Sequence, residues 1–330
     1  MRAKTRPAIA LLVPFALFTS SGTTLAQNGP GDAPAPTLES RLSPLIQAHQ
    51  GKVTLAVKNL DTGESFAVLP DEPMPTASLI KVAVMVEAYR QAAEKTLDLA
   101  RPVTLRETDK VPGSGILTGH FSEGASFPLV DAVHLMIAFS DNTATNLVLD
   151  QIGLKATAES MEAMGYPNTK IHSKVFRRDT SVFPERSQRF GLGSTTAAEM
   201  VRLFEALWRK EVVSPEASEA MLKHLRACDD KNKFPRFLPP GTRIAFKTGS
   251  VDASRTAAGV VECPAGPVAL CVMTAENQDK RYVADSAGDR LCAEIAREVH
   301  RHFGATKVNQ DKDKDKGPVA PTSPPGGETD

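Results

Sequence analysis

The sequence has no excess of charge of either sign, because its 330 residues include 39 basic and 39 acidic side chains. A chain without net positive charge has no general attraction to nucleic acid or to an anionic membrane surface, so we expect neither as a partner. Long hydrophobic runs are also lacking. The apolar run at 8–18 is too short to span a bilayer comfortably, and we expect no stable membrane insertion.

Cysteine and histidine are scarce, with four and seven residues, and their spacing matches no metal-site pattern apart from the pair His300 and His302. Nothing else in the sequence suggests a cofactor, and we expect none. Two alternatives stay open for the cysteines. Either Cys263 pairs with Cys271 across a hairpin and Cys228 with Cys292, or all four are buried free thiols.

Both ends of the chain have compositions that do not suit a packed core. Three basic residues, the apolar run and the small residues of Thr24-Leu25-Ala26 predict a signal peptide over 1–26, with cleavage near Ala26. We therefore expect an exported protein, periplasmic or secreted, with a linker over 27–36. At the other end, 305–330 alternates Asp with Lys and is then rich in Pro, Gly, Ser and Thr, which predicts a disordered tail.

Strand patterns lie at both ends of the remaining chain, and helical patterns fill its middle. Strands are expected at 53–57, 65–69, 243–247, 255–262 and 268–275. Helices are expected at 37–49, 78–95, 128–139, 143–151, 155–164, 195–210, 215–226 and 285–303. The segment 172–193 has no helical period and is expected to be a long loop.

These patterns predict an α/β (α+β) fold. Strands joined by tight turns form antiparallel sheets, so we expect one antiparallel sheet built from both chain ends and flanked by the terminal helices. The expected catalytic domain covers 37–304. Its α/β part consists of 37–72 and 239–304, and an all-helical insertion occupies 73–238.

The motif Ser78-Leu79-Ile80-Lys81 is the first candidate for chemistry. It opens the helix expected at 78–95, where free backbone N–H groups favour developing negative charge. A lysine in a mostly apolar helix is pushed toward its neutral form and can act as a base. Ser-x-x-Lys alone is common, and the alternative is an ordinary helix start with a surface lysine.

Two further motifs follow in order: Ser140-Asp141-Asn142 between two helices, and Lys247-Thr248-Gly249 on a strand. Together with the Ser78 motif they resemble the serine β-lactamases and penicillin-binding enzymes, most closely the class A β-lactamases. The resemblance covers roughly Leu38 to Phe303. It implies a class A β-lactamase or DD-peptidase-like fold and an acyl-enzyme on Ser78.

The resemblance also implies roles for individual residues. Lys81 takes the proton of Ser78, the backbone N–H groups of Ser78 and Ser250 hold the oxyanion, and Ser140 passes a proton to the leaving nitrogen. The expected substrate-binding residues are Asn142, Lys247, Thr248, Gly249 and Arg255. For Arg255 the alternative is a surface salt bridge, and Asp141 is expected to cap the following helix.

The chain departs from the class A pattern in the loop at 172–193. Class A enzymes release the acyl group with a glutamate in an E-x-x-x-N pattern, which this loop lacks, and the expected position falls near Phe176. The loop offers Asp179 and Glu185, and we keep Glu185 as the candidate base against the alternative of a surface role. Without a base that positions water, a β-lactam would acylate Ser78 and stay there.

Three hypotheses for function therefore remain open. The first is a serine β-lactamase that opens β-lactam amides. The second is an exported DD-peptidase- or esterase-like acyl hydrolase. The third is a penicillin-binding or sensor protein that is acylated without fast turnover, or a wall-binding domain without catalysis. In each case we expect a monomer that meets a small β-lactam or a cell-wall peptide.

Overall fold

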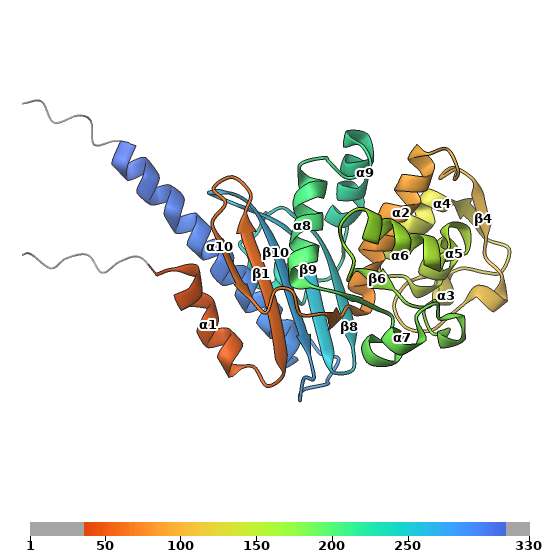
Figure 1. The fold of residues 1–330 in the computed structure, drawn as a ribbon, viewed down its shortest axis with the longest axis horizontal. Helices are drawn as coiled ribbons and strands as arrows, with labels where there is room; N and C mark the ends of the chain where they lie inside the picture. Colours follow the sequence, from red (N-terminus) through yellow and green to blue (C-terminus); the bar gives the residue numbers. More distant parts are fainter. Residues whose placement is uncertain (1–35, 315–330) are drawn as a thin grey trace, which may run out of the picture. The chain divides into compact units, whose positions relative to one another are not determined.

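The computed structural model describes residues 36–314, and side chains as far as residue 304 (Figure 1). The expected signal peptide at 1–26, nearly all of the linker and residues 315–330 of the tail lie outside the described residues. Within 36–314, no helix combines the length and the apolar character of a membrane span.

Five strands form one antiparallel sheet in the order β2-β1-β10-β9-β8. They are β1 (Lys52–Asn59), β2 (Ser65–Val68), β8 (Ile244–Val251), β9 (Ser254–Cys263) and β10 (Gly266–Ala275). β1 pairs with β10 along its whole length, from Lys52 opposite Ala275 to Asn59 opposite Val268. The two ends of the chain thus meet in one sheet, as predicted, and β8 is left at an edge.

Alternating side chains of the sheet supply two cores. On one face Leu55 and Val57 pack with the terminal helices α1 (Leu38–Ala48) and α10 (Ala287–Lys314). Ala56, between them in sequence, belongs to the core on the other face, which continues into the helical part. This is the period-2 pattern expected of strands that are buried on both faces.

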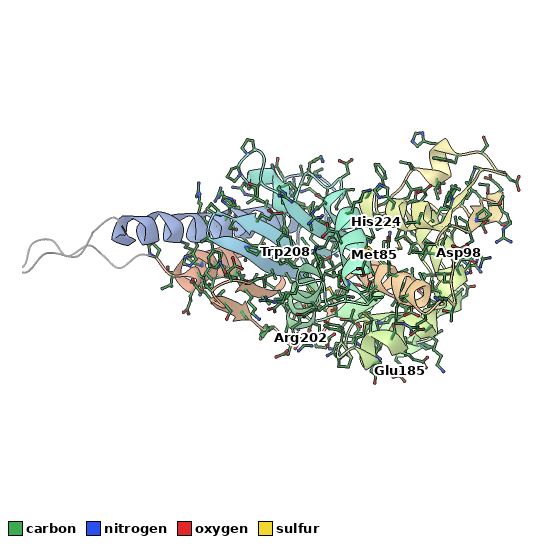
Figure 2. The ribbon with its side chains drawn as sticks, turned by 90° about the horizontal axis from the view of Figure 1, so that it is seen from above. Met85, Asp98, Glu185, Arg202, Trp208 and His224 are labelled. Atoms are coloured by element: carbon green, nitrogen blue, oxygen red, sulfur yellow. The ribbon has the colours of Figure 1, made fainter. Side chains whose placement is uncertain are left out.

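The helical part packs around α2 (Lys81–Ala93), whose first nine residues, from Lys81 to Tyr89, are all buried. Met85 belongs to this helix (Figure 2), and its side chain is fully buried. The other helices of this part are α3 (Leu117–His120), α4 (Leu129–Ala138), α5 (Asn142–Ile152), α6 (Leu154–Ala163), α7 (Pro184–Phe190), α8 (Ala197–Trp208) and α9 (Pro215–Arg226).

Short elements complete the fold. The strands β3 (Met74–Pro75), β6 (Lys170–Ile171) and β7 (Gly193–Thr195) form a small sheet, and β4 (Pro102–Thr104) pairs with β5 (Ser126–Pro128). Single 3-10 turns are η1 (Ala77–Ile80), η2 (Glu107–Asp109), η3 (Arg178–Thr180) and η4 (Phe234–Phe237). The helix expected over 78–95 is therefore two elements, since η1 precedes α2.

The segment 172–193 is more ordered than expected, because it contains η3 and the helix α7. Seven residues are too few to give a clear periodic signal in the sequence. The ends of the segment are tied together, since the His172 amide donates to the Leu192 carbonyl at 2.8 Å. The Val182 amide also donates to the His172 carbonyl at 3.0 Å.

The proposed disulfides are wrong, and the alternative of four buried free thiols is right. The β9–β10 hairpin turns so tightly that Cys263 lies opposite Gly266, while Cys271 lies further along, opposite Ala258. The two thiols are therefore not cross-strand neighbours. The expected start of the tail is also wrong, because α10 continues through 305–314 to Lys314. No proline interrupts that stretch, and Ala, Lys and Gln favour a helix.

Candidate active site

Ser78 lies in η1, half-buried at the edge of β8. The residue before it, Ala77, has a φ of +46°, in the left-handed region that L-residues rarely adopt. A Cβ on Gly249 would lie 2.4 Å from the Thr76 carbonyl oxygen and 2.8 Å from the Ser78 nitrogen. Only glycine therefore lets β8 lie directly against the turn that carries Ser78. Gly249 thus has a packing role in addition to the close approach of substrate that the sequence suggested for it.

Lys81 is fully buried at the start of α2. Its Nζ donates to the Ser140 carbonyl at 2.6 Å and to Asn142 Oδ1 at 2.9 Å, and it lies 3.3 Å from Ser140 Oγ. Burial, followed by the nearby charge of Lys247, lowers the pKa of Lys81 well below its ordinary value, although Asp141 acts in the opposite direction. A neutral amine keeps two N–H groups for the carbonyl and amide oxygens and one lone pair that can accept a proton.

Asp141, the middle residue of Ser140-Asp141-Asn142, holds this motif in place. Asp141 caps α5, since one carboxylate oxygen accepts from the Ala144 amide at 2.8 Å. The other oxygen accepts from the Ile116 and Leu117 amides, at 2.7 and 2.8 Å. The structural role expected for Asp141 is thus confirmed. Ser140 itself has a φ of +53°.

Lys247 completes the contact between the three motifs. It is fully buried on β8, and its Nζ donates to Ser140 Oγ at 3.1 Å and to the Thr248 carbonyl at 2.7 Å. Burial lowers its pKa, less strongly than that of Lys81. Ser140 Oγ therefore lies between two amines. Because an ammonium can only donate, the hydroxyl accepts from Lys247 and keeps its own proton to give away.

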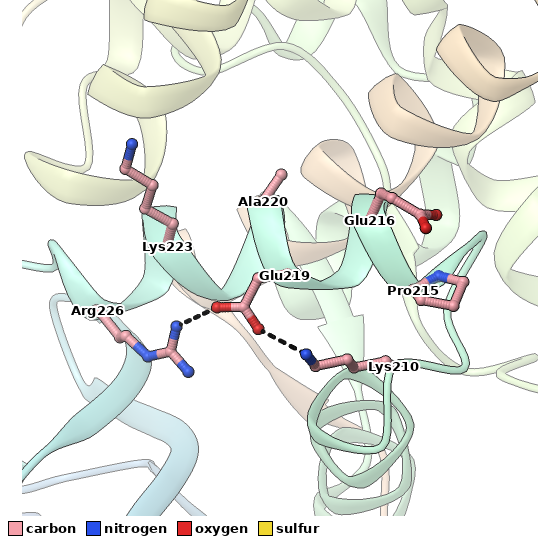
Figure 3. Close-up of a pocket in the computed structure, with 7 residues that line it drawn as sticks. All are labelled: Lys210, Pro215, Glu216, Glu219, Ala220, Lys223 and Arg226. Atoms are coloured by element: carbon pink, nitrogen blue, oxygen red, sulfur yellow. Dashed lines mark hydrogen bonds and ion pairs between the residues drawn. The ribbon is translucent and has the colours of Figure 1, made fainter.

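A cavity of 410 Å³ opens beside these groups. Its lining includes the predicted site residues Ser78, Ser140, Lys247, Thr248, Gly249 and Ser250. A larger concavity of 490 Å³ lies along α9, where Glu219 pairs with Arg226 at 2.7 Å and with Lys210 at 3.4 Å (Figure 3). None of the predicted site residues lines this larger concavity, so the smaller cavity is the candidate active site.

Lys233 is a member of the site that the sequence did not reveal. It lines the cavity, is 3% exposed, and donates to Ser250 Oγ at 3.1 Å. Its Nζ also lies 3.0 Å from Asp230 Oδ2 and 3.1 Å from Asp289 Oδ1. Burial acts to lower the pKa of Lys233, but the two carboxylates outweigh it and raise that pKa, so the ammonium is charged. No local motif marks this lysine, because Ser250 and Asp289 come from β8 and α10 and only Asp230 is near it in sequence.

Arg255 is buried against the β8–β9 turn. Its side chain is 1% exposed and is absent from the cavity lining. The guanidinium donates to the carbonyls of Val251 at 3.2 Å, Asp252 at 2.9 Å and Arg281 at 2.7 Å. These bonds hold the guanidinium against the β8–β9 turn, and its Nε also lies 3.6 Å from Asp289 Oδ1. The alternative of a surface salt bridge is wrong because the side chain is buried, and the predicted contact with substrate stays a prediction.

Glu185 is also absent from the cavity lining. It lies in the first turn of α7, exposed and at the periphery of the view in Figure 2. Phe176 is closer to the chemistry. A Cβ on Gly113 would lie 2.8 Å from Asn142 Nδ2 and 3.4 Å from the Phe176 ring, so this ring and the Asn142 amide flank one point. The carboxylates that line the cavity in the described chain are Asp229, Asp230 and Asp289, each within 3.1 Å of a lysine Nζ.

The chain is similar to known enzymes over nearly all of this fold. A model of the Beta-lactamase enzyme family matches residues 37–303. A β-lactamase of Proteus vulgaris is 26% identical over 76% of this chain and 82% of the relative. The structure of a Sphaerobacter thermophilus β-lactamase matches with a TM-score of 0.71 and 28% identity, covering 81% and 98% of the two chains.

The structure of PBP-A matches with a TM-score of 0.70 and 26% identity, over 81% of this chain and 96% of that one. A point mutant of PBP-A, solved as an acyl-enzyme complex with penicillin G, has a TM-score of 0.69 and 25% identity, over the same shares. The family match spans the sheet, the helical part and the three motifs together. The chain therefore belongs to the β-lactamase enzyme family of serine hydrolases.

Proposed function

We propose that Ser78 of this protein is acylated by β-lactams and related carboxylate-bearing amides, and that the acyl group is released slowly. One observation carries the proposal. Lys81 and Lys247 both reach Ser140 Oγ beside the cavity that Ser78 lines, whereas the ring of Phe176 lies near Asn142. The protein would then behave as a penicillin-binding enzyme and not as a fast β-lactamase.

Acylation would begin with transfer of the Ser78 proton to the neutral Lys81 amine. The Ser78 oxygen then attacks the amide carbon, and the family pattern assigns the backbone N–H groups of Ser78 and Ser250 to the oxyanion. Each such donor is worth roughly 3–4 kcal/mol of the barrier. Ser140 gives its proton to the leaving nitrogen and recovers one from Lys81, whose Nζ is 3.3 Å away.

The substrate carboxylate would be held by Lys247, Thr248 and Ser250. Since Lys233 donates to Ser250 Oγ, the Ser250 hydroxyl keeps its own proton for the ligand. Lys233 thus takes the place that the sequence suggested for Arg255. The Lys233 cation is balanced by Asp230 and Asp289, so its part is to orient Ser250 more than to add net charge.

Hydrolysis of the acyl-enzyme needs a base that activates water, and general-base catalysis contributes roughly 10²–10⁴-fold. Phe176 cannot accept a proton. Glu185 is exposed on α7, and Asp179 is paired with Arg177 at 3.0 Å. The similarity to the PBP-A mutant whose structure is an acyl-enzyme complex with penicillin G supports the proposal.

The test is intact-protein mass spectrometry of the mature chain mixed with benzylpenicillin and followed over time. We expect an adduct of one drug mass that persists for many minutes, and no adduct in Ser78→Ala. An adduct that decays within seconds with release of hydrolysed drug would make the protein a β-lactamase. Absence of any adduct would contradict the proposal.

We also propose that the protein is exported, because 1–26 has the composition of a signal peptide, and that it acts as a monomer. N-terminal sequencing of the protein recovered from outside the cytoplasm should begin at Gln27. Light scattering of that material should give the mass of one chain. A start at Met1, or the mass of two chains, would contradict these proposals.

A further inference from the structure

We infer that the leaving-group half of the cavity selects an apolar, preferably aromatic, side chain, in a pocket formed by Phe139, Tyr282 and Val283. The favoured substrates are then amides whose leaving amine carries both a carboxylate and a large apolar group. This inference rests on the proposed acylation of Ser78. It names the substrate class that the same site prefers.

The first support is where exposed apolar surface gathers. Three of the eight large hydrophobic side chains that are exposed in the described chain line this one cavity: Phe139, Tyr282 and Val283, which are 40%, 66% and 47% exposed. Such side chains gain free energy when a ligand covers them. Most of the other lining residues are polar or charged, so these three side chains form the apolar part of a largely polar cavity.

The second support is that Tyr282 is fixed in place before any ligand binds. Its hydroxyl accepts a hydrogen bond from the Asp252 amide at 2.6 Å, and the Arg255 guanidinium carbon lies 4.7 Å from the centre of its ring. Arg255 is itself held by the carbonyls described above. A ring that is already ordered loses little conformational entropy when it binds. Arg255 is thus a positioning residue that acts through Tyr282.

The third support is the side of the scissile bond on which these residues lie. Phe139 directly precedes Ser140, the proton donor to the leaving nitrogen, and it lines the cavity with Lys247 and Thr248, which hold the carboxylate. Asn142 and Phe176, near the acyl group, are absent from that lining. The cavity therefore extends from Ser78 toward the leaving group, with room for a side chain in its 410 Å³.

A matched pair of cephalosporins tests the inference. Both carry the same acyl side chain, and they differ at ring position 3, which belongs to the leaving-group half: one has a methyl group and the other a styryl group. Acylation rate constants are measured from the mass of the Ser78 adduct. Because stacking on an ordered ring is worth about a tenfold preference, we expect the styryl compound to react about ten times faster with the wild type.

Variants then assign the preference to residues. Tyr282→Ala and Phe139→Ala should each reduce the styryl-to-methyl rate ratio several-fold. Tyr282→Phe keeps the ring and its contact with Arg255 but loses the bond to the Asp252 amide, so it should retain more of the ratio than Tyr282→Ala. Arg255→Lys should lower the ratio as well, because it releases Tyr282. Leu69→Ala, at the opposite edge of the sheet and 54% exposed, is the matched control and should leave the ratio unchanged.

The outcomes separate this inference from the proposed function. If neither cephalosporin labels Ser78, the proposed acylation fails. If both label it, but the wild-type ratio is near one or the Tyr282 and Phe139 substitutions do not change it, acylation stands and the apolar pocket is refuted. A ratio that falls equally in Leu69→Ala also refutes it, since the effect would then not come from the pocket.

Discussion

Replacing Phe176 by glutamate should turn a persistent acyl-enzyme into one that hydrolyses. The ring of Phe176 and the Asn142 amide flank the same point above Gly113, so a carboxylate at this position would reach the acyl group from the Asn142 side. A water molecule between that carboxylate and the ester could then be activated. The substitution adds the one chemical group that the described site lacks for deacylation.

The structure indicates that the fold will tolerate this change. Phe176 is 64% exposed, so its contacts are worth about a third of a fully buried phenylalanine, roughly 0.5–1 kcal/mol. Its φ of +59° is already borne by a residue with a Cβ, so glutamate brings no new backbone strain. A positioned base is worth roughly 10²–10⁴-fold, and we expect about 100-fold, because nothing else in the loop has been adjusted to it.

The assay is the decay of the benzylpenicillin adduct after unbound drug is removed. Phe176→Gln is the matched control, with the same shape and no basic group, and it should decay like the wild type. Acylation rates should stay similar in all three proteins. If Phe176→Glu folds normally, forms the adduct and releases it no faster than Phe176→Gln, the assignment of position 176 is wrong.

Three further predictions concern the buried groups. The acylation rate should rise with pH as Lys81, whose pKa is strongly lowered, loses its proton. It should fall at higher pH as Lys247 loses its own proton. A pH–rate profile without this alkaline fall would contradict the role of Lys247. Gly249→Ala should slow acylation about 100-fold by displacing the turn that carries Ser78, because its Cβ would lie 2.4 Å from the Thr76 carbonyl oxygen; normal labelling by penicillin would refute this. Burial, followed by the charge of the neighbouring His134, lowers the pKa of His224 from 6.5 to about 4. Between pH 6.5 and 4 the unfolded chain therefore binds a proton that the folded protein does not, and the free energy of unfolding decreases as the pH falls through this range. His224→Gln should reduce that loss by up to roughly 3 kcal/mol in urea unfolding at the two pH values.

The sequence predicted the sheet well because its strands are strongly patterned. β1, β9 and β10 are runs of Val, Ala, Leu and similar residues bounded by turn residues, and their edges were found to within a few residues. Short elements gave no such signal. The helix α7 has seven residues, and η1 was taken as the first turn of α2 because both are equally apolar.

The sequence predicted those residues of the candidate site that belong to contiguous motifs. It did not predict residues that reach the site only through the packing of distant segments. Lys233 is recognisable only once η4, β8 and α10 are packed together, because its partners Ser250 and Asp289 are far away in sequence. Arg255 comes shortly after the Lys247 motif in the sequence, which suggested that it binds substrate. Sequence distance could not reveal that its guanidinium is captured by the carbonyls of the turn.

Under the proposed function, the packing also explains how acylation is kept while deacylation is slow. Lys81 Nζ donates to Asn142 Oδ1 at 2.9 Å and to the Ser140 backbone carbonyl at 2.6 Å, so loss of the Lys81 or the Asn142 side chain leaves a buried polar group unpaired at a cost of about 1–3 kcal/mol. The acylating groups are thus tied to the stability of the fold. The side chain at position 176 is exposed and contributes little to the stability of the fold. A glutamate at this position would therefore serve the reaction and not the fold. A protein that needs a lasting acyl-enzyme can give up that carboxylate and keep its fold.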